Sequence, residues 1–319
     1  MKNFFSVEDV PNVYHLIQEA ISIKQKPYDY QYIGKNKTIG LVFFNPSLRT
    51  RISCQKACFN LGCHTWILDL NKDSWKIEMN DGSIMKMKQE HIKEAISVMS
   101  RYCDILAVRT FPNLLDRDDD YKETIFKKIM TYSQVPVINM ESATLHPLQS
   151  LADLITIAEY SSFFKKKSKV VLSWAPHVNP LPQSVANSFA QWISKIEQID
   201  FVISCPKEYH LCEKFSLKSK IIHHQNEAFL GSDFIYAKNW SSYLYYGKVI
   251  QKDYSDWMIT EQKMNITNQA KFMHCLPVRR NVVVEDSVLD SPNSIILQQA
   301  ENRIFSAQIV FLKILQFLS

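Results

Sequence analysis

The stretch Phe43-Phe44-Asn45-Pro46-Ser47-Leu48-Arg49-Thr50-Arg51 joins two segments of different hydrophobic periodicity. Residues 38–44 are apolar and β-prone, whereas residues 52–61 place apolar side chains at helical spacing. The stretch is therefore predicted to be a strand-to-helix turn. A helix N-terminus offers unpaired N–H groups and the positive end of its dipole, and hydroxyl and guanidinium donors beside it suit a phosphate. We interpret this turn as an anion site, and an ordinary capped helix with surface charges is the alternative.

The same alternation continues along the chain and predicts βα units around parallel sheets. Strand-like runs in the first half cover residues 38–44, 64–70, 103–108 and 135–140, and helical patterns cover 7–24, 50–61, 89–100 and 121–132. A second set of strand-like runs covers 169–175, 200–205, 233–237, 271–276 and 294–298. Two longer helices are expected at 148–160 and 302–318. The fold class is therefore α/β with two parallel-sheet domains.

Composition fits an ordinary enzyme-sized protein. The chain has 319 residues, 46% hydrophobic and 22% charged, which suits two domains with proper cores. The net charge of +5 is mild, and no basic stripe interleaved with aromatic residues indicates nucleic-acid binding. Seven Cys without a C-x-x-C pair, and no signal-like or membrane-spanning apolar segment, favour a reducing cytoplasm without membrane attachment. His223-His224 and residues 116–120 lack the spacing of metal ligands, so no metal site is expected.

Polar residues cluster just after the predicted strands. They are Asn45–Thr50, Arg109, Glu141–Gln149, His177, Lys238 and His274–Arg279. Ligands of open parallel sheets bind at the carboxyl ends of strands, so these residues are expected to converge on a cleft, which two facing sheets would place between domains.

Three of these clusters, Ser47-Leu48-Arg49-Thr50-Arg51, His146-Pro147-Leu148-Gln149 and His274-Cys275-Leu276-Pro277-Val278-Arg279-Arg280, form a set. On the basis of these motifs, and over essentially its whole length, the chain resembles the transcarbamylases. Within that family it resembles the N-acylornithine carbamoyltransferases. The resemblance implies a carbamoyl phosphate-binding domain over residues 1–145, completed by 301–319, and an acceptor-binding domain over 146–300. It also implies that the two long helices link the domains and that the proline-rich segment 176–183 forms a knotted crossing.

The resemblance implies the roles of individual residues and no metal or organic cofactor. Carbamoyl phosphate would be bound by Ser47, Leu48, Arg49, Thr50, Trp75, Arg109, His146, Pro147, Leu148, Gln149, Cys275, Leu276 and Arg303. Of these, Arg109, His146, Gln149 and Cys275 would act in catalysis, by holding the carbamoyl group and stabilising its developing charge. A covalent role for Cys275 is the alternative, but an activated donor needs no thiol nucleophile. The acceptor would contact Glu141, His177, Lys238 and Arg279.

Several of these assignments have ordinary alternatives. For His146 alone the alternative is a structural His before Pro147, and the shared spacing with Gln149 favours a functional role. Trp75 lies in a polar stretch and, by resemblance, reaches a neighbouring subunit's site in a homotrimer; simple surface packing is the alternative. Arg303 is expected to be the first residue of the last helix. A positive charge there is repelled by the positive end of the helix dipole unless an anion is bound nearby. A solvated charge at the helix start is its alternative.

The acceptor is inferred from the segment Asp233 to Trp240. Lys238 stands where enzymes that use free ornithine have a site for its α-ammonium, so an acylated α-nitrogen is expected, although an ordinary surface Lys is the alternative. Gln89 matches neither the Pro of succinyl enzymes nor the Glu of acetyl enzymes, and being uncharged it does not repel a succinyl carboxylate. We favour N-succinylornithine, with N-acetylornithine as the alternative and a non-catalytic binder of phosphorylated ligands as a third interpretation.

Overall fold

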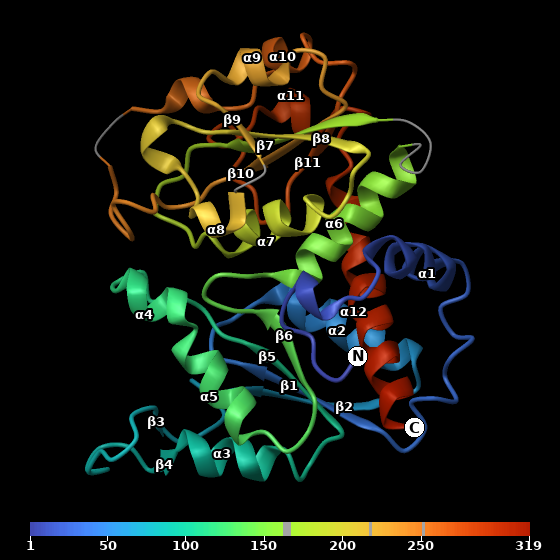
Figure 1. Cartoon of the computed structure of the whole chain (residues 1–319), viewed down its shortest axis with the longest axis vertical. Helices are drawn as coiled ribbons and strands as arrows, with labels where there is room; N and C mark the ends of the chain where they lie inside the picture. Colours follow the sequence, from blue (N-terminus) through green and yellow to red (C-terminus); the bar gives the residue numbers. More distant parts are fainter. Residues whose placement is uncertain (162–166, 217–218, 251–252) are drawn as a thin grey trace. The chain divides into compact units, whose positions relative to one another are not determined.

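The computed structural model describes residues 1–161, 167–216, 219–250 and 253–319. The chain separates into two compact units. Unit 1 comprises Met1–Asn113, Asp118–Leu148 and Arg303–Ser319, and unit 2 comprises Leu114–Arg117 and Gln149–Asn302. Each unit contains a parallel β-sheet with helices packed on it (Figure 1). The predicted α/β class with two parallel sheets is confirmed.

The sheet of unit 1 has the strand order β2-β1-β5-β6. Its strands are β1 (Thr38–Phe43), β2 (His64–Asp69), β5 (Ile105–Arg109) and β6 (Val137–Glu141), and the two-residue strands β3 (Ile77–Glu78) and β4 (Glu90–His91) pair separately. Its helices are α1 (Val13–Gln25), α2 (Leu48–Asn60), α3 (Ile92–Met99), α5 (Thr124–Tyr132) and the second part of α12 (Ile296–Leu318), while α4 covers Arg117–Lys122. Strand β1 lies inside the sheet, which explains why five of its six residues are buried.

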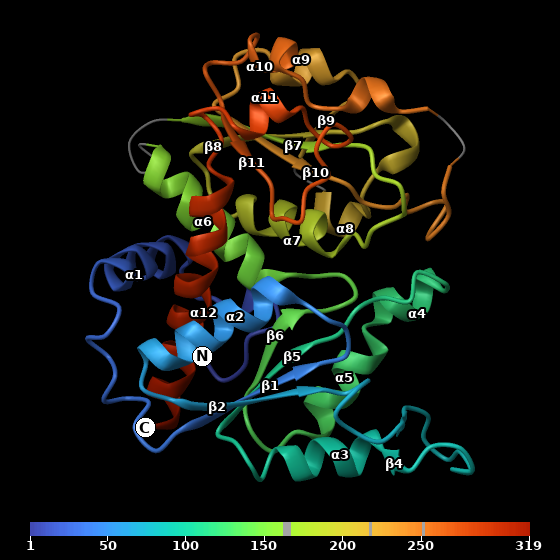
Figure 2. The same ribbon diagram turned by 180° about the vertical axis from the view of Figure 1, so that it is seen from behind.

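Two helix layers stabilise this sheet. Helices α3 and α5 lie side by side (Figure 1) and bury Ile96 and Phe126 against Val42 and Val108 of the strands. The Arg303–Leu318 part of α12 runs beside α2 (Figure 2), where the Asn60 Nδ2 donates a hydrogen bond to the Gln308 Oε1 at 2.8 Å. Segments far apart in the sequence therefore contact each other within unit 1.

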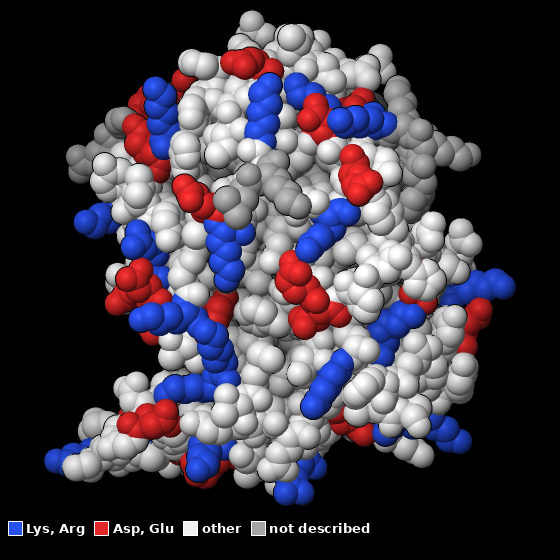
Figure 3. Space-filling model, viewed as in Figure 1, with Lys and Arg blue, Asp and Glu red and all other residues white. Residues whose placement is uncertain are grey.

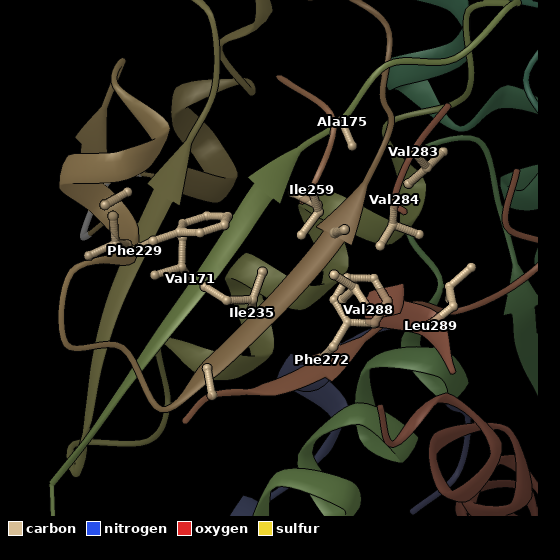
Figure 4. Packing of buried hydrophobic residues seen from close by; sticks show 14 of the residues in the cluster. Val171, Ala175, Phe229, Ile235, Ile259, Phe272, Val283, Val284, Val288 and Leu289 are labelled. Atoms are coloured by element: carbon tan, nitrogen blue, oxygen red, sulfur yellow. The ribbon is translucent and has the colours of Figure 1, made fainter. Parts of the chain in front are cut away.

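The sheet of unit 2 has the order β11-β10-β7-β8-β9. Its strands are β7 (Ser168–Trp174), β8 (Ile199–Ser204), β9 (Lys220–Ile222), β10 (Phe234–Lys238) and β11 (Lys271–Met273). The helices are α6 (Pro147–Tyr160, whose first two residues belong to unit 1), α7 (Ser184–Ile193), α8 (Glu213–Ser216), α9 (Gln225–Phe229), α10 (Glu261–Met264), α11 (Asp286–Leu289) and the start of α12. Phe229 of α9 and Val288 of α11 pack against Ile235 and Phe272 on one face of the sheet (Figure 4).

The prediction of a strand over residues 294–298 is wrong. Only an isolated bridge joins Ser294 to Phe272, and α12 begins at Ile296. The amide of Ile295 still bonds the carbonyl of Phe272, and the carbonyl of Ile295 then accepts the amide of Gln299 as the helix starts. A short apolar run fits a buried strand and a buried helix equally well, so periodicity could not separate them. The edge strand β9 was not predicted.

This longer α12 also overturns one expectation about a site residue. Arg303 is the eighth residue of the helix rather than its first, so the argument from an exposed helix start does not apply. The side chain is buried instead.

Charged side chains of both signs are interspersed on the face shown in Figure 3. Among the residues that the structure describes, no helix combines the length and apolar character needed to cross a membrane.

Candidate functional site

The predicted strand-to-helix turn is confirmed at the end of β1. Ser47 is the N-cap of α2, and its hydroxyl accepts a hydrogen bond from the amide of Thr50 at 3.4 Å. The Oγ1 of Thr50 accepts a hydrogen bond from the Nη2 of Arg303 at 2.6 Å. A guanidinium from the far end of the chain thus lies at the first turn of α2, where the dipole already favours an anion.

A second cationic group lies where β5 and β6 end. Arg109 and Glu141 close these neighbouring strands and are paired in register. The Nη1 of Arg109 donates to the Oε2 of Glu141, and the Nε2 of His146 lies 3.4 Å from the same oxygen. All three side chains are buried, and the Nε of Arg109 has no hydrogen-bond partner among the described residues. A buried donor of this kind is suited to a ligand oxygen.

Cys54 lies close to both groups. It sits one helical turn after Thr50 in α2, and burial raises the pKa of its thiol to about 12, an effect that the positive charges of Arg303 and Arg109 oppose. The thiol therefore stays protonated at neutral pH. The thiol also experiences the positive charge of both guanidinium groups, which belong to unit 1.

Glu123 has a structural role that its place in the sequence does not reveal. Its buried carboxylate accepts hydrogen bonds from the Ser142 hydroxyl at 2.7 Å, the Ala143 amide at 3.2 Å and the Thr144 amide at 2.7 Å. The Thr144 hydroxyl donates to it as well. Burial raises the pKa of this carboxyl, and the four hydrogen bonds oppose the rise. Glu123 therefore fixes the loop that separates Glu141 from His146, but in the sequence it looks like any Glu at a helix start.

In unit 2 the structure brings Gln149 together with the turn at residues 274–277. The Oδ1 of Asp153 accepts hydrogen bonds from the Nε2 of Gln149 and the Nε2 of Gln299, both at 2.7 Å. The Oε1 of Gln299 accepts the amide of His274 at 2.8 Å. Cys275, the next residue, is buried. Neither Asp153 nor Gln299 was predicted, because each reads in the sequence as a polar residue within a helix.

Three cationic or titratable side chains meet elsewhere in unit 2. The Nε of Arg279 donates to the Nε2 of His177 at 3.1 Å. Burial lowers the pKa of His177, and the positive charges of Lys238 and Arg279 lower it further. Lys238 closes β10, is buried, and donates to the carbonyl of Asn239 at 2.9 Å. Two cations beside a neutral imidazole suit a carboxylate ligand.

His177 also borders a cavity of about 380 Å³ in unit 2, whose walls include Trp174, Pro180, Tyr209, Trp240 and Tyr254. The cavity is large enough for a small organic molecule.

The remaining predicted residues are placed as follows. Arg49 and Leu48 lie on the first turn of α2, with Leu48 67% exposed, while Pro147 and Leu148 open α6 and are buried. Leu276 lies in the turn after β11 with φ 58°. Trp75 is 67% exposed on the loop after β2, so the structure does not bring it into either group of unit 1. Glu141, also predicted to contact the acceptor, belongs to unit 1 and pairs with Arg109, and the other three acceptor residues belong to unit 2. Among the described residues no cluster of His, Cys, Asp and Glu could hold a metal ion.

Comparison with known proteins matches both halves of the chain to one protein family. Residues 2–159 match the family "Aspartate/ornithine carbamoyltransferase, carbamoyl-P binding domain", and residues 181–314 match the "Asp/Orn binding domain" of the same family. An N-succinylornithine carbamoyltransferase of Bacteroides thetaiotaomicron is 48% identical over 319 residues, with 99% of each chain covered. An N-acetylornithine carbamoyltransferase of Xanthomonas campestris pv. campestris is 39% identical over 289 residues, with 85% of each chain covered.

A solved structure gives the same match in three dimensions. A point mutant of N-acetyl-L-ornithine transcarbamylase complexed with carbamyl phosphate and N-succinyl-L-norvaline superposes with a TM-score of 0.91 at 36% identity. The match covers 98% of this chain and 100% of that one.

Proposed function

Because the chain belongs to the aspartate/ornithine carbamoyltransferase family and is a carbamoyltransferase, we propose that it carbamoylates the δ-amine of N2-succinyl-L-ornithine. The products are N-succinyl-L-citrulline and phosphate, formed in arginine biosynthesis in the cytoplasm. The observation that carries the choice of an acylated acceptor is the meeting of His177, Lys238 and Arg279. A free α-ammonium would be repelled there, whereas acylation leaves the α-nitrogen uncharged and the α-carboxylate as the charged group at this end of the acceptor.

The donor side of the proposed site lies in unit 1. The phosphate of carbamoyl phosphate is bound by Ser47, Leu48, Arg49 and Thr50 through hydroxyls, backbone amides and a guanidinium, with Arg303 beside them. Arg109 and His146 donate to the carbamoyl oxygen as it gains charge. These donors are buried and already held by Glu141, so little reorganisation accompanies the reaction.

The remaining proposed contacts orient the carbamoyl nitrogen and the amine. Gln149 accepts from the carbamoyl NH₂, and the carbonyls of Cys275 and Leu276 accept from the NH₂ and the attacking amine. The amine has an intrinsic pKa of about 10.4, like Lys, and must lose a proton. The departing phosphate takes that proton, so the residues act by position and electrostatics rather than as a strong base. Glu141 completes the acceptor contacts with His177, Lys238 and Arg279.

N-acetylornithine is the second candidate acceptor. Gln89 lies on the exposed loop between β3 and β4, where it carries neither the Pro nor the Glu of the two enzyme types. The higher identity to the succinyl enzyme, 48% against 39%, supports succinylornithine.

We also propose that the protein is a homotrimer in which Trp75 reaches the site of the next subunit. Its exposure at 67% fits a residue that is covered by a second copy. Leu48, Ile52 and Phe59 of α2 are 67%, 55% and 61% exposed and add apolar surface to unit 1.

The test is product formation from carbamoyl phosphate with succinylornithine, acetylornithine and ornithine side by side. Citrulline-type product with succinylornithine as the best acceptor is expected. Preference for acetylornithine would overturn the choice of acyl group, and no product with any acceptor would favour a non-catalytic binder.

The Arg49→Ala variant tests the phosphate site. Loss of the guanidinium should lower turnover at least 100-fold and weaken carbamoyl phosphate binding, since one charge-assisted contact to a transition state contributes about 3 kcal/mol. Arg101→Ala, at an exposed Arg in the same unit, is the matched control and should behave as the unsubstituted protein. Normal activity of Arg49→Ala would contradict the proposed function.

A further inference from the structure

The carboxylate of Asp153 occupies a central place in unit 2 that the proposed chemistry does not use. Asp153, Gln149 and Gln299 are fully buried. One oxygen, Oδ1, accepts hydrogen bonds from the NH₂ groups of both glutamines. Because the Asp153 Oδ1 accepts both hydrogen bonds, each glutamine turns its NH₂ toward Asp153 and its carbonyl oxygen away. The orientation of both amides is therefore decided by chemistry and not by shape alone.

The orientation of Gln299 also determines the hydrogen bonds of the turn at residues 274–277. Its Oε1 accepts the amide of His274, and the Nδ1 of His274 accepts the amide of Leu276 at 2.9 Å. Leu276 has φ 58°, a left-handed conformation that costs a branched residue about 1 kcal/mol and needs such support. A series of hydrogen bonds thus runs from Asp153 through Gln299 and His274 to the amide of Leu276 in this turn.

Tyr236 borders the same carboxylate. Burial raises the pKa of its phenol well above the usual value, and the neighbouring Asp153 and Cys275 raise it further. The phenol of β10 therefore lies between the helix residue Asp153 and the turn residue Cys275, and it stays protonated at physiological pH.

We propose that Asp153 is a positioning residue that sets the Gln149 amide and, through Gln299, the 274–277 turn with a single carboxylate oxygen. The role rests on the proposed function, because it matters for catalysis only if Gln149 and this turn hold the carbamoyl group. Asp153 acts through these two glutamines. It ensures that Gln149 presents an oxygen, and not an NH₂, on the side away from Asp153.

Gln299→Glu is the discriminating variant. It replaces the NH₂ that faces Asp153 by oxygen, so two carboxyl groups must share one proton to restore the contact. Like-charged carboxylates in contact raise each other's pKa, so the shared proton is lost as the pH rises. The ratio of kcat of the variant to kcat of the unsubstituted enzyme should fall at least tenfold between about pH 6 and pH 9. The Tyr236 phenol, which stays neutral over this range, borders Asp153 as well as Cys275.

Thr156→Val is the matched control. Thr156 is equally buried on α6 and accepts a hydrogen bond from Asn302 of α12 at 2.9 Å, without connection to Gln149 or His274. Its loss should lower thermal stability while the kcat ratio stays constant with pH. A constant ratio for Gln299→Glu would overturn the proposal.

Two further measurements keep the test decisive. The side-chain NH₂ resonances of Gln149 should titrate in Gln299→Glu with the midpoint of the shared proton, and resonances that stay fixed would overturn the proposal. This readout needs no product, so its result is independent of whether the proposed function holds. If Gln299→Glu does not fold, Asp153→Asn is the second variant, because it keeps an accepting oxygen without the charge. It should lower kcat about tenfold with little change in KM, as expected when one charge-assisted hydrogen bond is weakened. An unchanged kcat would again overturn the role.

Discussion

At the scale of single residues, His177 shows how neighbouring cations set the state of a binding group. Its Nε2 accepts a hydrogen bond from Arg279, which requires a neutral imidazole. Burial lowers its pKa first, and Lys238 and Arg279 lower it further. The ring is therefore neutral at pH 7 and lies between two cationic side chains that suit an anionic acceptor.

This arrangement gives a prediction about pH. In Arg279→Ala the pKa of His177 should rise toward its ordinary value, because one of the charges that oppose protonation is gone. A histidine ¹³C NMR titration of the unsubstituted and variant proteins measures both values. Lys195→Ala, at an exposed Lys in unit 2, is the control and should leave the pKa unchanged. A pKa that falls or stays fixed in Arg279→Ala would contradict the assignment of Arg279 as a cause.

The sign of the linked stability follows from the direction of this shift. Because the folded-state pKa is lowered, the unfolded chain takes up the proton first as pH falls. The contribution of His177 to stability is complete above its unfolded pKa of about 6.5 and is lost as pH falls through the folded-state pKa. Acceptor binding should weaken over the same interval, since the protonated ring no longer accepts from Arg279.

At the scale of elements, the hydrophobic pattern predicts the strands and helices next to the site residues. It does not predict the loops that orient those residues. The turn from β1 to α2 was predicted because apolar periodicity changes across Ser47 to Thr50. The 294–298 segment failed because three apolar residues suit either a strand or a helix, and pairing with Phe272 ends where α12 begins. The support of residues 142–144 by Glu123 depends on a contact about twenty residues away, which periodicity does not encode.

Glu123 leads to a prediction on this loop. Glu123→Ala removes the acceptor for four donors and leaves buried hydroxyl and amide groups unsatisfied, so unfolding free energy should fall by about 3 kcal/mol. Glu123→Gln should cost much less, about 1 kcal/mol or below, because burial already favours the uncharged carboxyl and raises its pKa. Urea denaturation measures both values.

The matched control for these variants is Glu94→Ala, at an exposed Glu of α3, which should change stability by about 0.5 kcal/mol or less. Equal losses for Glu123→Ala and Glu123→Gln would show that the charge, and not the accepting oxygens, supports the loop.

At the scale of the whole molecule, the proposed trimer predicts complementation between subunits. The mass in solution should be three times the 37.2 kDa of the chain, as measured by light scattering. Arg49→Ala and Trp75→Ala are each expected to have low activity. If Trp75 completes the neighbouring subunit's site, a refolded mixture contains some sites with both native residues and should recover a substantial part of the activity. A mixture as inactive as its components would contradict shared sites, and a mass of 37.2 kDa would contradict the trimer itself.

The sequence by itself determined the α/β class, the order of most strands and helices, and the motif residues placed just after strands. These are local properties, because hydrophobic period, helix caps and breaks act over a few neighbouring residues. Tertiary structure alone decided that Arg303 lies against Thr50, that Glu123 holds the loop before His146, and that Asp153 joins Gln149 to the His274 turn. A buried polar group needs partners, but any of many distant residues could supply them. Only the fold selects which ones do.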